Sequence, residues 1–271
     1  MAHRARSLVM DLFGEYLRYT GAEARLGTLI ALMEAFGIEP ATTRVTLSRL
    51  KKDGWFSTRR EGRETVYVLS EHMLGVLREG RERIFTRVDG EWDGWWTQVL
   101  YQVPESDRTA RESLRKQLTW LGFGQFAPSV WLSPHRTRDR VEQLRQDFPG
   151  ATVDILRSRT AGLTEDLDLA RRCWDLGELA EGYRAFIAEH RSLDTAAGLP
   201  SGREALVTRT AVVAEARRLT FRDPNLPVEL QPLDWPGREA FELFRRVHAG
   251  LGPAARAYVE SVIGSELPLD Q

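Results

Sequence analysis

The amino-terminal part of the chain predicts an order of elements that restricts the possible folds more than any other feature of the sequence. Residues 5–19 place apolar side chains at three-to-four spacing, which predicts an amphipathic helix. A second helix is predicted at roughly 26–36, and Pro40 begins a third at its first helical position. The run WFSTRREGRETVYVL then reads as two strands joined around Glu61-Gly62. Three helices followed by a hairpin predict a winged helix-turn-helix.

The third helix carries more polar and basic surface than folding requires. Thr43, Leu47 and Leu50 fall at i, i+4 and i+7, which predicts a thin buried stripe. Such a helix can lie in a DNA major groove, where arginine reads guanine edges and hydroxyl groups reach bases or phosphates. The residues predicted to contact duplex DNA are those outside the stripe and at the hairpin tip: Thr42, Arg44, Val45, Ser48, Arg49, Lys51, Lys52, Arg59, Arg60 and Arg63.

The distribution of charge supports this prediction. The whole chain has a net charge of −1, but residues 44–63 hold seven Lys or Arg against two Asp or Glu. Residues 1–87 carry 15 basic and 11 acidic residues, which leaves 23 basic and 28 acidic residues in the rest. Positive charge is therefore concentrated where the DNA contacts are expected. Two alternatives remain: the charges only solvate an exposed face, or the winged helix binds another protein.

The middle of the chain predicts a second folded part. Its expected elements are a strand at 95–103, a helix at 111–121, two strands within 122–132, a helix containing Val141, Leu144 and Phe148, and the strand ATVDIL. This βαββαβ order is typical of a ferredoxin-like small domain.

From about residue 165 the chain is helical and acidic. Leu176, Leu179 and Tyr183 align on one predicted helical face, together with Phe186 or Ile187. Further helices near 203–219 and 238–249 flank the Pro-rich connector RDPNLPVELQPLDWPG. This connector is predicted to be a rigid loop that holds the helices together, with Trp235 as its packed anchor.

Several stretches resemble one known family. LFGEYLRYTG, LGTLIALMEAFGI, RVTLSRLKKDGW and REGRETVYVLS are similar to the amino-terminal domain of PaaX-type regulators, the phenylacetic acid degradation repressors. WDGWWTQVLYQVPESDR, LRKQLTWLGFGQFAPSVWLSP and RDPNLPVELQPLDWPG extend the resemblance over nearly the whole chain. The resemblance implies a repressor of phenylacetic acid catabolism with a Cas2-like central domain.

The Cas2-like resemblance raises the question of an enzyme. Some Cas2 proteins are reported as nucleases, in which an aspartate that ends the first strand can hold a metal ion. The matching stretch here is Tyr101-Gln102-Val103. Glutamine brings no negative charge for a divalent cation, so we expect a spacer and dimerisation element without enzymatic activity. A Cas2-like metal-dependent nuclease with a DNA-targeting winged helix is the alternative, and a scaffold that binds no DNA is another.

The family resemblance also implies an effector, an aryl- or acyl-CoA such as phenylacetyl-CoA. It further implies, as the alternative to a rigid loop, that the Pro-rich connector is one wall of the effector pocket. A CoA ligand needs arginines for its phosphates and an apolar lining for its acyl group. The candidate effector residues are Arg209, Arg217, Arg218, Arg222 and Trp235. A His-Glu-Tyr-Arg-Arg run of the family reads Ala214-Glu215-Ala216-Arg217-Arg218 here, so the ligand is expected to be different or more apolar if those positions line the pocket.

These observations predict an α+β multidomain protein. A winged-helix DNA-binding domain is expected at 1–88, a ferredoxin-like, Cas2-like domain at 89–160, and a helical effector and dimerisation domain at 161–271. Its predicted partners are a double-stranded DNA operator, a small-molecule effector and a second copy of the chain.

Other catalytic signals are absent from the sequence. No GxSxG, HExxH or GxxxxGKS motif occurs, so we expect no cofactor, no metal and no catalytic residue. The single Cys173 is predicted to be a core residue. The scattered histidines are predicted to be surface or packed residues: His3, His72, His135, His190 and His248. The sequence shows no signal peptide or apolar run long enough to span a bilayer, which predicts a cytoplasmic protein.

Overall fold

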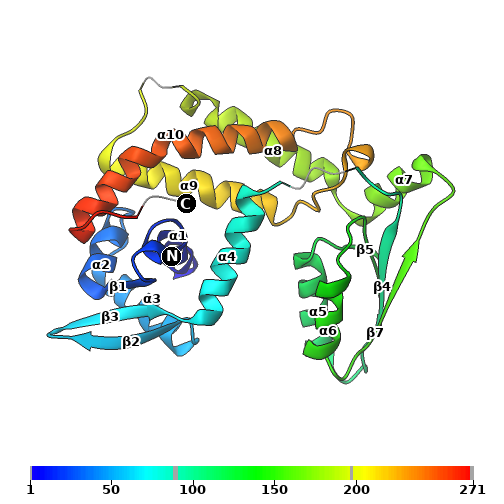
Figure 1. Cartoon of the computed structure of the whole chain (residues 1–271), viewed down its shortest axis with the longest axis horizontal. Helices are drawn as coiled ribbons and strands as arrows, with labels where there is room; N and C mark the ends of the chain where they lie inside the picture. The colour runs from blue at the N-terminus through cyan, green and yellow to red at the C-terminus, as the bar shows by residue number, and fades with distance from the viewer. Residues whose placement is uncertain (1, 88–90, 196–197, 269–271) are drawn as a thin grey trace. The chain divides into compact units, whose positions relative to one another are not determined.

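The computed structural model describes residues 2–87, 91–195 and 198–268, and Figure 1 shows its helices and strands. The chain is a mixed α+β protein with two antiparallel sheets. It divides into two compact units. The first comprises Met1–Thr86, Phe186–Arg217 and Glu239–Gln271, and the second Arg87–Ala185 and Arg218–Arg238. The predicted domain boundary between residues 88 and 89 lies outside the described residues, and the predicted division into three domains stays a prediction.

The first unit begins with the predicted helices and hairpin. Its elements are α1 (Ala2–Glu15), β1 (Glu23–Arg25), α2 (Leu26–Glu34), α3 (Pro40–Lys52), β2 (Phe56–Glu61), β3 (Glu64–Leu69) and α4 (Glu71–Phe85). The strands form a sheet in the order β1-β3-β2. Pro40 begins α3, as predicted, and Gly54 at φ 77° follows its end in the left-handed region that favours glycine.

The carboxy-terminal helices share one core with these elements. Helices α9 (Gly202–Thr220) and α10 (Gly237–Ile263) contribute Leu206, Ala255 and Val259 to the cluster that includes Leu12 and Phe13 of α1. All five of these side chains are fully buried. The amino-terminal segment is therefore folded against α9 and α10 by a continuous apolar core.

The second unit is built on a four-stranded sheet in the order β5-β6-β4-β7. Its elements are β4 (Trp96–Gln102), α5 (Arg108–Trp120), β5 (Gly124–Ala127), β6 (Val130–Ser133), α6 (Arg138–Asp147), β7 (Thr152–Ser158) and α7 (Leu163–Cys173). This reproduces the predicted βαββαβ order up to β7. Helix α8 (Leu176–His190) belongs to this unit up to Ala185 and to the first unit from Phe186. Val99 and Trp131 pack with α5 and α6 on one face of the sheet. Trp96 and Leu132 on the other face pack with Ala170 of α7.

Three predicted helix boundaries were wrong. Helix α1 ends at Glu15, and a 3₁₀ turn at Leu17–Tyr19 replaces its predicted last turn. The helical stretch from 165 breaks between α7 and α8, where Asp175 accepts a hydrogen bond from the Glu178 amide at 3.0 Å and starts the second helix. Helix α10 continues past 249, because burial of Leu251, Ala255 and Val259 outweighs the hydrogen bond lost at Pro253.

Within the described ranges, no helix combines the length and the apolar character that crossing a bilayer requires.

Candidate nucleic-acid interface

Helix α3 has the two faces that its sequence predicts. Thr43, Leu47 and Leu50 are buried, at 0%, 0% and 1% exposure, and Thr46 is buried beside them. Thr42 is half-buried, and the exposed residues are Arg44, Val45, Ser48, Arg49, Lys51 and Lys52. Val45 is 50% exposed, which is unusual for a branched apolar side chain and suits contact with a thymine methyl group.

The hairpin lies where it was predicted. Pairing of Glu61 with Glu64 leaves Gly62 and Arg63 as a two-residue loop, and Gly62 adopts φ 60°. Because side chains alternate along a strand, Arg60 lies on the same face as the core residue Phe56, and Arg59 lies on the opposite face. The predicted contact residues of the hairpin are thus divided between its two faces.

Arg59 is paired with carboxylates on its face of the sheet. Its guanidinium donates to Glu23 at 2.5 Å and to Glu61 at 2.8 Å, and Arg25 also donates to Glu61 at 2.6 Å. Hydrogen bonds from Arg25 and Arg59 hold the pKa of Glu61 below its ordinary value. The positive charge of Arg59 is therefore largely neutralised. By contrast, Arg60 donates to the backbone carbonyl of Arg63 at 3.2 Å.

The carboxy-terminal end of α3 is held at two points. Lys51 Nζ donates to Thr58 Oγ1 of β2 at 2.8 Å. Arg6 of α1 pairs with Asp53 at 3.0 Å, and its guanidinium carbon lies 3.9 Å from the centroid of the Trp55 ring. Arg6 has no local signal in the sequence, because its partners lie nearly fifty residues further along the chain. These contacts fix α3 relative to α1 and the hairpin.

The predicted effector residues fall in both compact units. Arg209 and Arg217 belong to the first unit, and Arg218, Arg222 and Trp235 belong to the second. Arg222 forms an exposed ion pair with Glu178 at 2.8 Å. Trp235 packs edge-on against Tyr183, with ring centroids 5.8 Å apart.

Arg209 lies in a buried group of charged and polar side chains that we call the Glu15 cluster: Glu15, Tyr16, Arg81, Arg209 and His248. The Glu15 carboxylate accepts hydrogen bonds from His248 Nε2 at 2.7 Å and from the guanidinium groups of Arg209 at 3.0 Å and Arg81 at 3.5 Å. Burial raises the pKa of Glu15, but His248 and Arg209 outweigh it and hold that pKa below its ordinary value. Burial lowers the pKa of His248, so the imidazole favours its neutral form and donates through Nε2.

A second, partly buried ion pair joins two of the same helices, α1 and α9. Asp11 is 5% exposed and accepts a hydrogen bond from Arg217. Burial, with a smaller contribution from the charge of Glu15, raises the pKa of Asp11 to about 6, although Arg217 opposes the shift. The ionised form of Asp11 is therefore costly in the folded protein.

Replacing Asp11 by asparagine is expected to change the pH dependence of stability. A carboxyl group with a raised folded pKa stabilises the fold below its unfolded pKa, and this contribution is lost as pH rises through about 6. The difference in the free energy of unfolding between wild type and Asp11→Asn should therefore fall by about 2 kcal/mol between pH 4 and 7, at about 1.4 kcal/mol per pKa unit. Urea unfolding at several pH values measures this difference, and a constant difference would contradict it.

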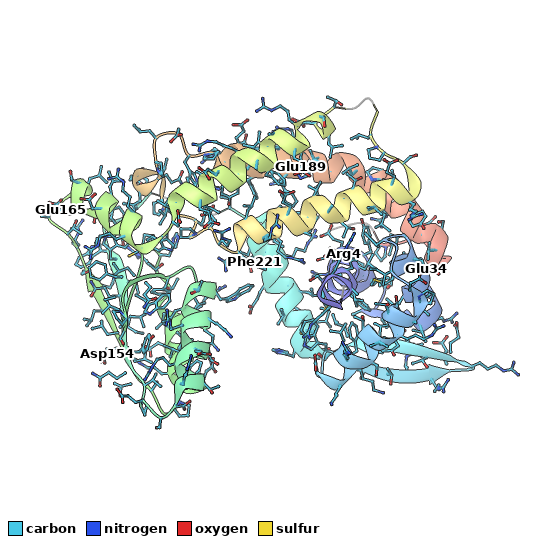
Figure 2. All side chains as sticks on the ribbon, turned by 180° about the vertical axis from the view of Figure 1, so that it is seen from behind. Arg4, Glu34, Asp154, Glu165, Glu189 and Phe221 are labelled. Carbon is cyan, nitrogen blue, oxygen red and sulfur yellow. The ribbon has the colours of Figure 1, made fainter. Side chains whose placement is uncertain are left out.

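Gln102 ends β4 at an exposed position opposite Thr152. Strand β4 holds no carboxylate. Asp154 of β7, which is labelled in Figure 2, pairs with Leu100, and Gln102 pairs with Thr152. One group of possible metal ligands within the described residues was not predicted: Glu189, His190 and Glu215, whose ligand atoms lie within 4.8 Å of one another. His190 and Glu215 already bond each other at 2.8 Å. Of the other histidines, His248 is packed, as predicted, and the side chain of His3 lies outside the described residues.

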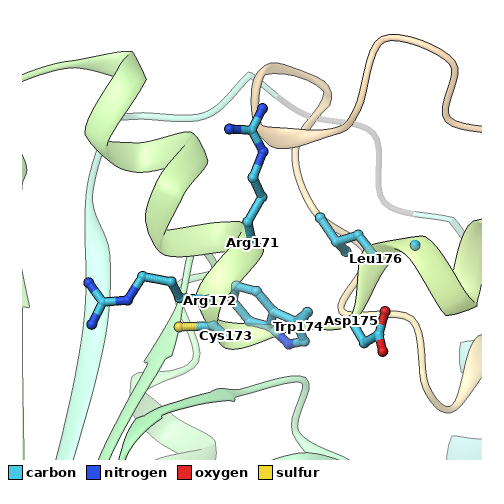
Figure 3. A pocket seen from close by; sticks show the side chains of 7 residues that line it. Arg171, Arg172, Cys173, Trp174, Asp175 and Leu176 are labelled. Carbon is cyan, nitrogen blue, oxygen red and sulfur yellow. The ribbon is translucent and has the colours of Figure 1, made fainter.

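A pocket of about 460 Å³ lies at the junction of α7 and α8, lined by residues 171–177. Figure 3 shows the guanidinium groups of Arg171 and Arg172 pointing in different directions, with the indole of Trp174 below Arg171. Burial raises the pKa of Cys173 to about 11, so its thiol stays protonated and is a poor nucleophile. Trp174 and Trp235 pack against the same apolar cluster, which connects the lining of this pocket with the predicted connector.

Comparisons with known proteins cover the same regions. Residues 4–73 match the family model described as PaaX-like protein, residues 89–170 the PaaX protein central Cas2-like domain, and residues 174–261 the PaaX-like protein C-terminal domain. The chain is 32% identical to the transcriptional repressor PaaX of Escherichia coli (strain K12), over 97% of this chain and 86% of that protein. A solved structure, the uncharacterized protein Rv0674 from Mycobacterium tuberculosis, is 28% identical with a TM-score of 0.59, covering 94% of this chain and 98% of that one.

Proposed function

The chain belongs to the PaaX family, and we propose that it is a ligand-responsive transcriptional repressor that binds an operator as a cytoplasmic homodimer. The observation that carries this proposal is the outer face of α3, which presents short polar and basic side chains over a fully buried apolar stripe. A symmetric dimer would offer one such helix to each half of a roughly two-fold symmetric site.

The proposed DNA-binding domain is a winged helix, and the order of α1, α2, α3 and the β2-β3 hairpin supports this. In this arrangement α3 enters the major groove and the hairpin reaches the adjacent backbone. Arg44, Val45 and Ser48 are the proposed base contacts. The remaining proposed contacts, mainly to phosphates, are Thr42, Arg49, Lys51, Lys52, Arg60 and Arg63, with Arg59 weakened by its ion pairs.

Arg44→Ala is expected to weaken operator binding by about 1–3 kcal/mol, whereas Arg60→Ala should weaken binding to all duplexes and lower the salt slope by about one. The difference arises because base contacts carry sequence information and phosphate contacts do not. Arg25→Ala is the matched control, since Arg25 is an exposed arginine of the same sheet that pairs with Glu61 and Glu64. Fluorescence anisotropy at several salt concentrations measures each affinity. Operator affinities for Arg44→Ala and Arg60→Ala equal to wild type would contradict the proposed interface.

The central part is proposed to be a ferredoxin-like domain that acts as a spacer and dimerisation element. The strand order β5-β6-β4-β7, with α5 and α6 on one face, supports this fold. A non-enzymatic role is supported by the likeness to a repressor and by Gln102 at the end of β4. The three-domain division at residues 88 and 160 is proposed on the same basis.

The proposed effector is an aryl- or acyl-CoA. Arg218, Arg222 and Trp235 remain the proposed contacts in the second unit. The pocket in that unit combines the apolar side chains of Trp174 and Leu176 with the charged side chains of Arg171, Arg172 and Asp175. Arg209 and Arg217 are also in the predicted set, but a ligand would have to replace Glu15 and Asp11 as their partners.

The effector proposal predicts that a thioester releases the protein from DNA. Operator binding should weaken on titration with phenylacetyl-CoA or another acyl-CoA, and should not respond to free phenylacetate or free CoA. The physical reason is that a thioester joins the phosphates and the apolar group in one ligand, so both contribute to binding. Release by an unrelated metabolite, with no response to any thioester, would overturn this part of the proposal.

A further inference from the structure

The Glu15 cluster joins four helices that are far apart in the sequence. Glu15 is the last residue of α1 and Tyr16 follows it directly. Arg81 comes from α4, Arg209 from α9 and His248 from α10. Arg209 donates to Glu15, to the Tyr16 hydroxyl at 2.8 Å and to the His248 carbonyl at 3.1 Å. One guanidinium therefore connects the first helix of the proposed DNA-binding domain with both long carboxy-terminal helices.

Two further polar contacts join α9 to the amino-terminal segment. Arg217 of α9 pairs with Asp11 one turn earlier on α1, and Arg203 near the start of α9 donates to the Ala35 carbonyl at 2.8 Å, at the end of α2. Helix α9 is thus bonded at three places to the segment that positions α3.

Because the Glu15 cluster is buried, its charged side chains must stay in contact with their partners on the neighbouring helices. The side chains of Glu15, Arg209 and His248 are only 7%, 9% and 11% exposed. In such an environment a charged pair gains little net stability over apolar packing, but a charge that loses its partner is strongly disfavoured. Apolar contacts between α1 and α9 would tolerate sliding, whereas these bonds permit few alternative arrangements. A shift of α9 or α10 must therefore move α1 or break the cluster.

We propose that the Glu15 cluster couples the carboxy-terminal helices to operator binding, with Glu15, Arg209 and His248 acting as positioning residues rather than as ligand contacts. This inference rests on the proposed function. In it, the effector changes the position of α9 and α10, and the cluster passes that change to α1, which holds α3 through Arg6.

The test uses the full-length double variant Glu15→Gln with Arg209→Met, which removes both charges while keeping the side-chain lengths similar. Operator and non-specific duplex affinities are measured with and without phenylacetyl-CoA, and thioester binding is measured directly by calorimetry. The double variant should bind the thioester within about threefold of wild type, but its operator affinity should no longer respond to it. The matched control is Arg246→Gln with Asp194→Asn, an exposed ion pair of the first unit at 2.9 Å, which should respond as wild type does.

A second readout requires no effector. Because the cluster positions α1, the ratio of operator to non-specific affinity should fall at least about tenfold in the double variant and stay unchanged in the control. The second readout distinguishes the effector proposal from the positioning proposal. If no thioester changes the operator affinity of the wild-type protein, the effector proposal is wrong, and the ratio of operator to non-specific affinity still tests whether the cluster positions α1. If the double variant does not fold, Arg209→Lys, which keeps the charge and loses the forked geometry, should lower the same ratio. A folded variant with the wild-type affinity ratio and thioester response would overturn the inference.

Discussion

Replacing Glu15 by alanine is expected to lower the free energy of unfolding by about 3–5 kcal/mol. The carboxylate is the shared acceptor of Arg209, His248 and Arg81, and its side chain is 7% exposed. Its removal leaves the guanidinium of Arg209 buried and charged, and among the described residues the Tyr16 hydroxyl and the His248 carbonyl remain to accept its hydrogen bonds. Urea unfolding followed by circular dichroism at pH 7 measures the loss.

Two comparisons make this result specific to the buried charge. Glu239→Ala removes a carboxylate of the same unit that pairs with Arg191 at 2.8 Å, but both side chains are more than half exposed, so the loss should stay below about 1 kcal/mol. The double variant Glu15→Gln with Arg209→Met should be more stable than Glu15→Ala, although it carries one more substitution, because it leaves no buried guanidinium at position 209 without a carboxylate partner. Equal losses for Glu15→Ala and Glu239→Ala would show that Glu15 is not the centre of a buried cluster.

The sequence predicts those parts of the interface that local rules determine. The buried stripe of α3 follows from the spacing of Thr43, Leu47 and Leu50, and the hairpin turn follows from Gly62 between two β-rich runs. The division of Arg59 and Arg60 between two faces also follows from strand alternation, once the register is known. Each of these features depends on residues within about a dozen positions of one another.

The Glu15 cluster has no local signal of this kind. Arg209 and Tyr16 are 193 residues apart, and His248 and Glu15 are 233 residues apart. In the sequence, Arg209 is one of several arginines on a helix, where exposure to solvent is the ordinary expectation. Its burial depends on how α9 packs on α1, and that packing is decided by apolar residues such as Leu206, Leu12 and Phe13. The same reason explains why the continuation of α10 through Pro253 was missed.

Trp96→Ala is expected to destabilise the protein by about 3–5 kcal/mol through the second unit. The Trp96 side chain is fully buried, stacks on Trp174 with ring centroids 6.3 Å apart, and lies edge-on to Trp92 at 5.4 Å. Its Nε1 also donates to Asp166 at 2.7 Å, and Asp166 is 6% exposed. Alanine would therefore leave a cavity and remove one of the donors to the buried carboxylate of Asp166, to which Thr160 Oγ1 also donates at 2.8 Å.

Two further substitutions distinguish the effect of the cavity from the effect of the lost hydrogen bond to Asp166. Trp96→Phe keeps most of the apolar volume and removes the N–H group, so it should cost about 1–3 kcal/mol, chiefly from the weaker satisfaction of Asp166. Trp95→Phe changes a half-buried neighbour that packs beneath Arg157 and Arg159, and should cost less than about 1 kcal/mol. Circular dichroism is the suitable probe, because each substitution also changes tryptophan fluorescence. Asp166 lies on α7, so the size of the Trp96→Ala effect also tests whether α7 is part of the cooperative unit. A loss of about 3–5 kcal/mol in the free energy of unfolding would mean that α7 unfolds together with the four-stranded sheet. A loss as small as that of Trp95→Phe would mean that α7 contributes little to the stability of that unit.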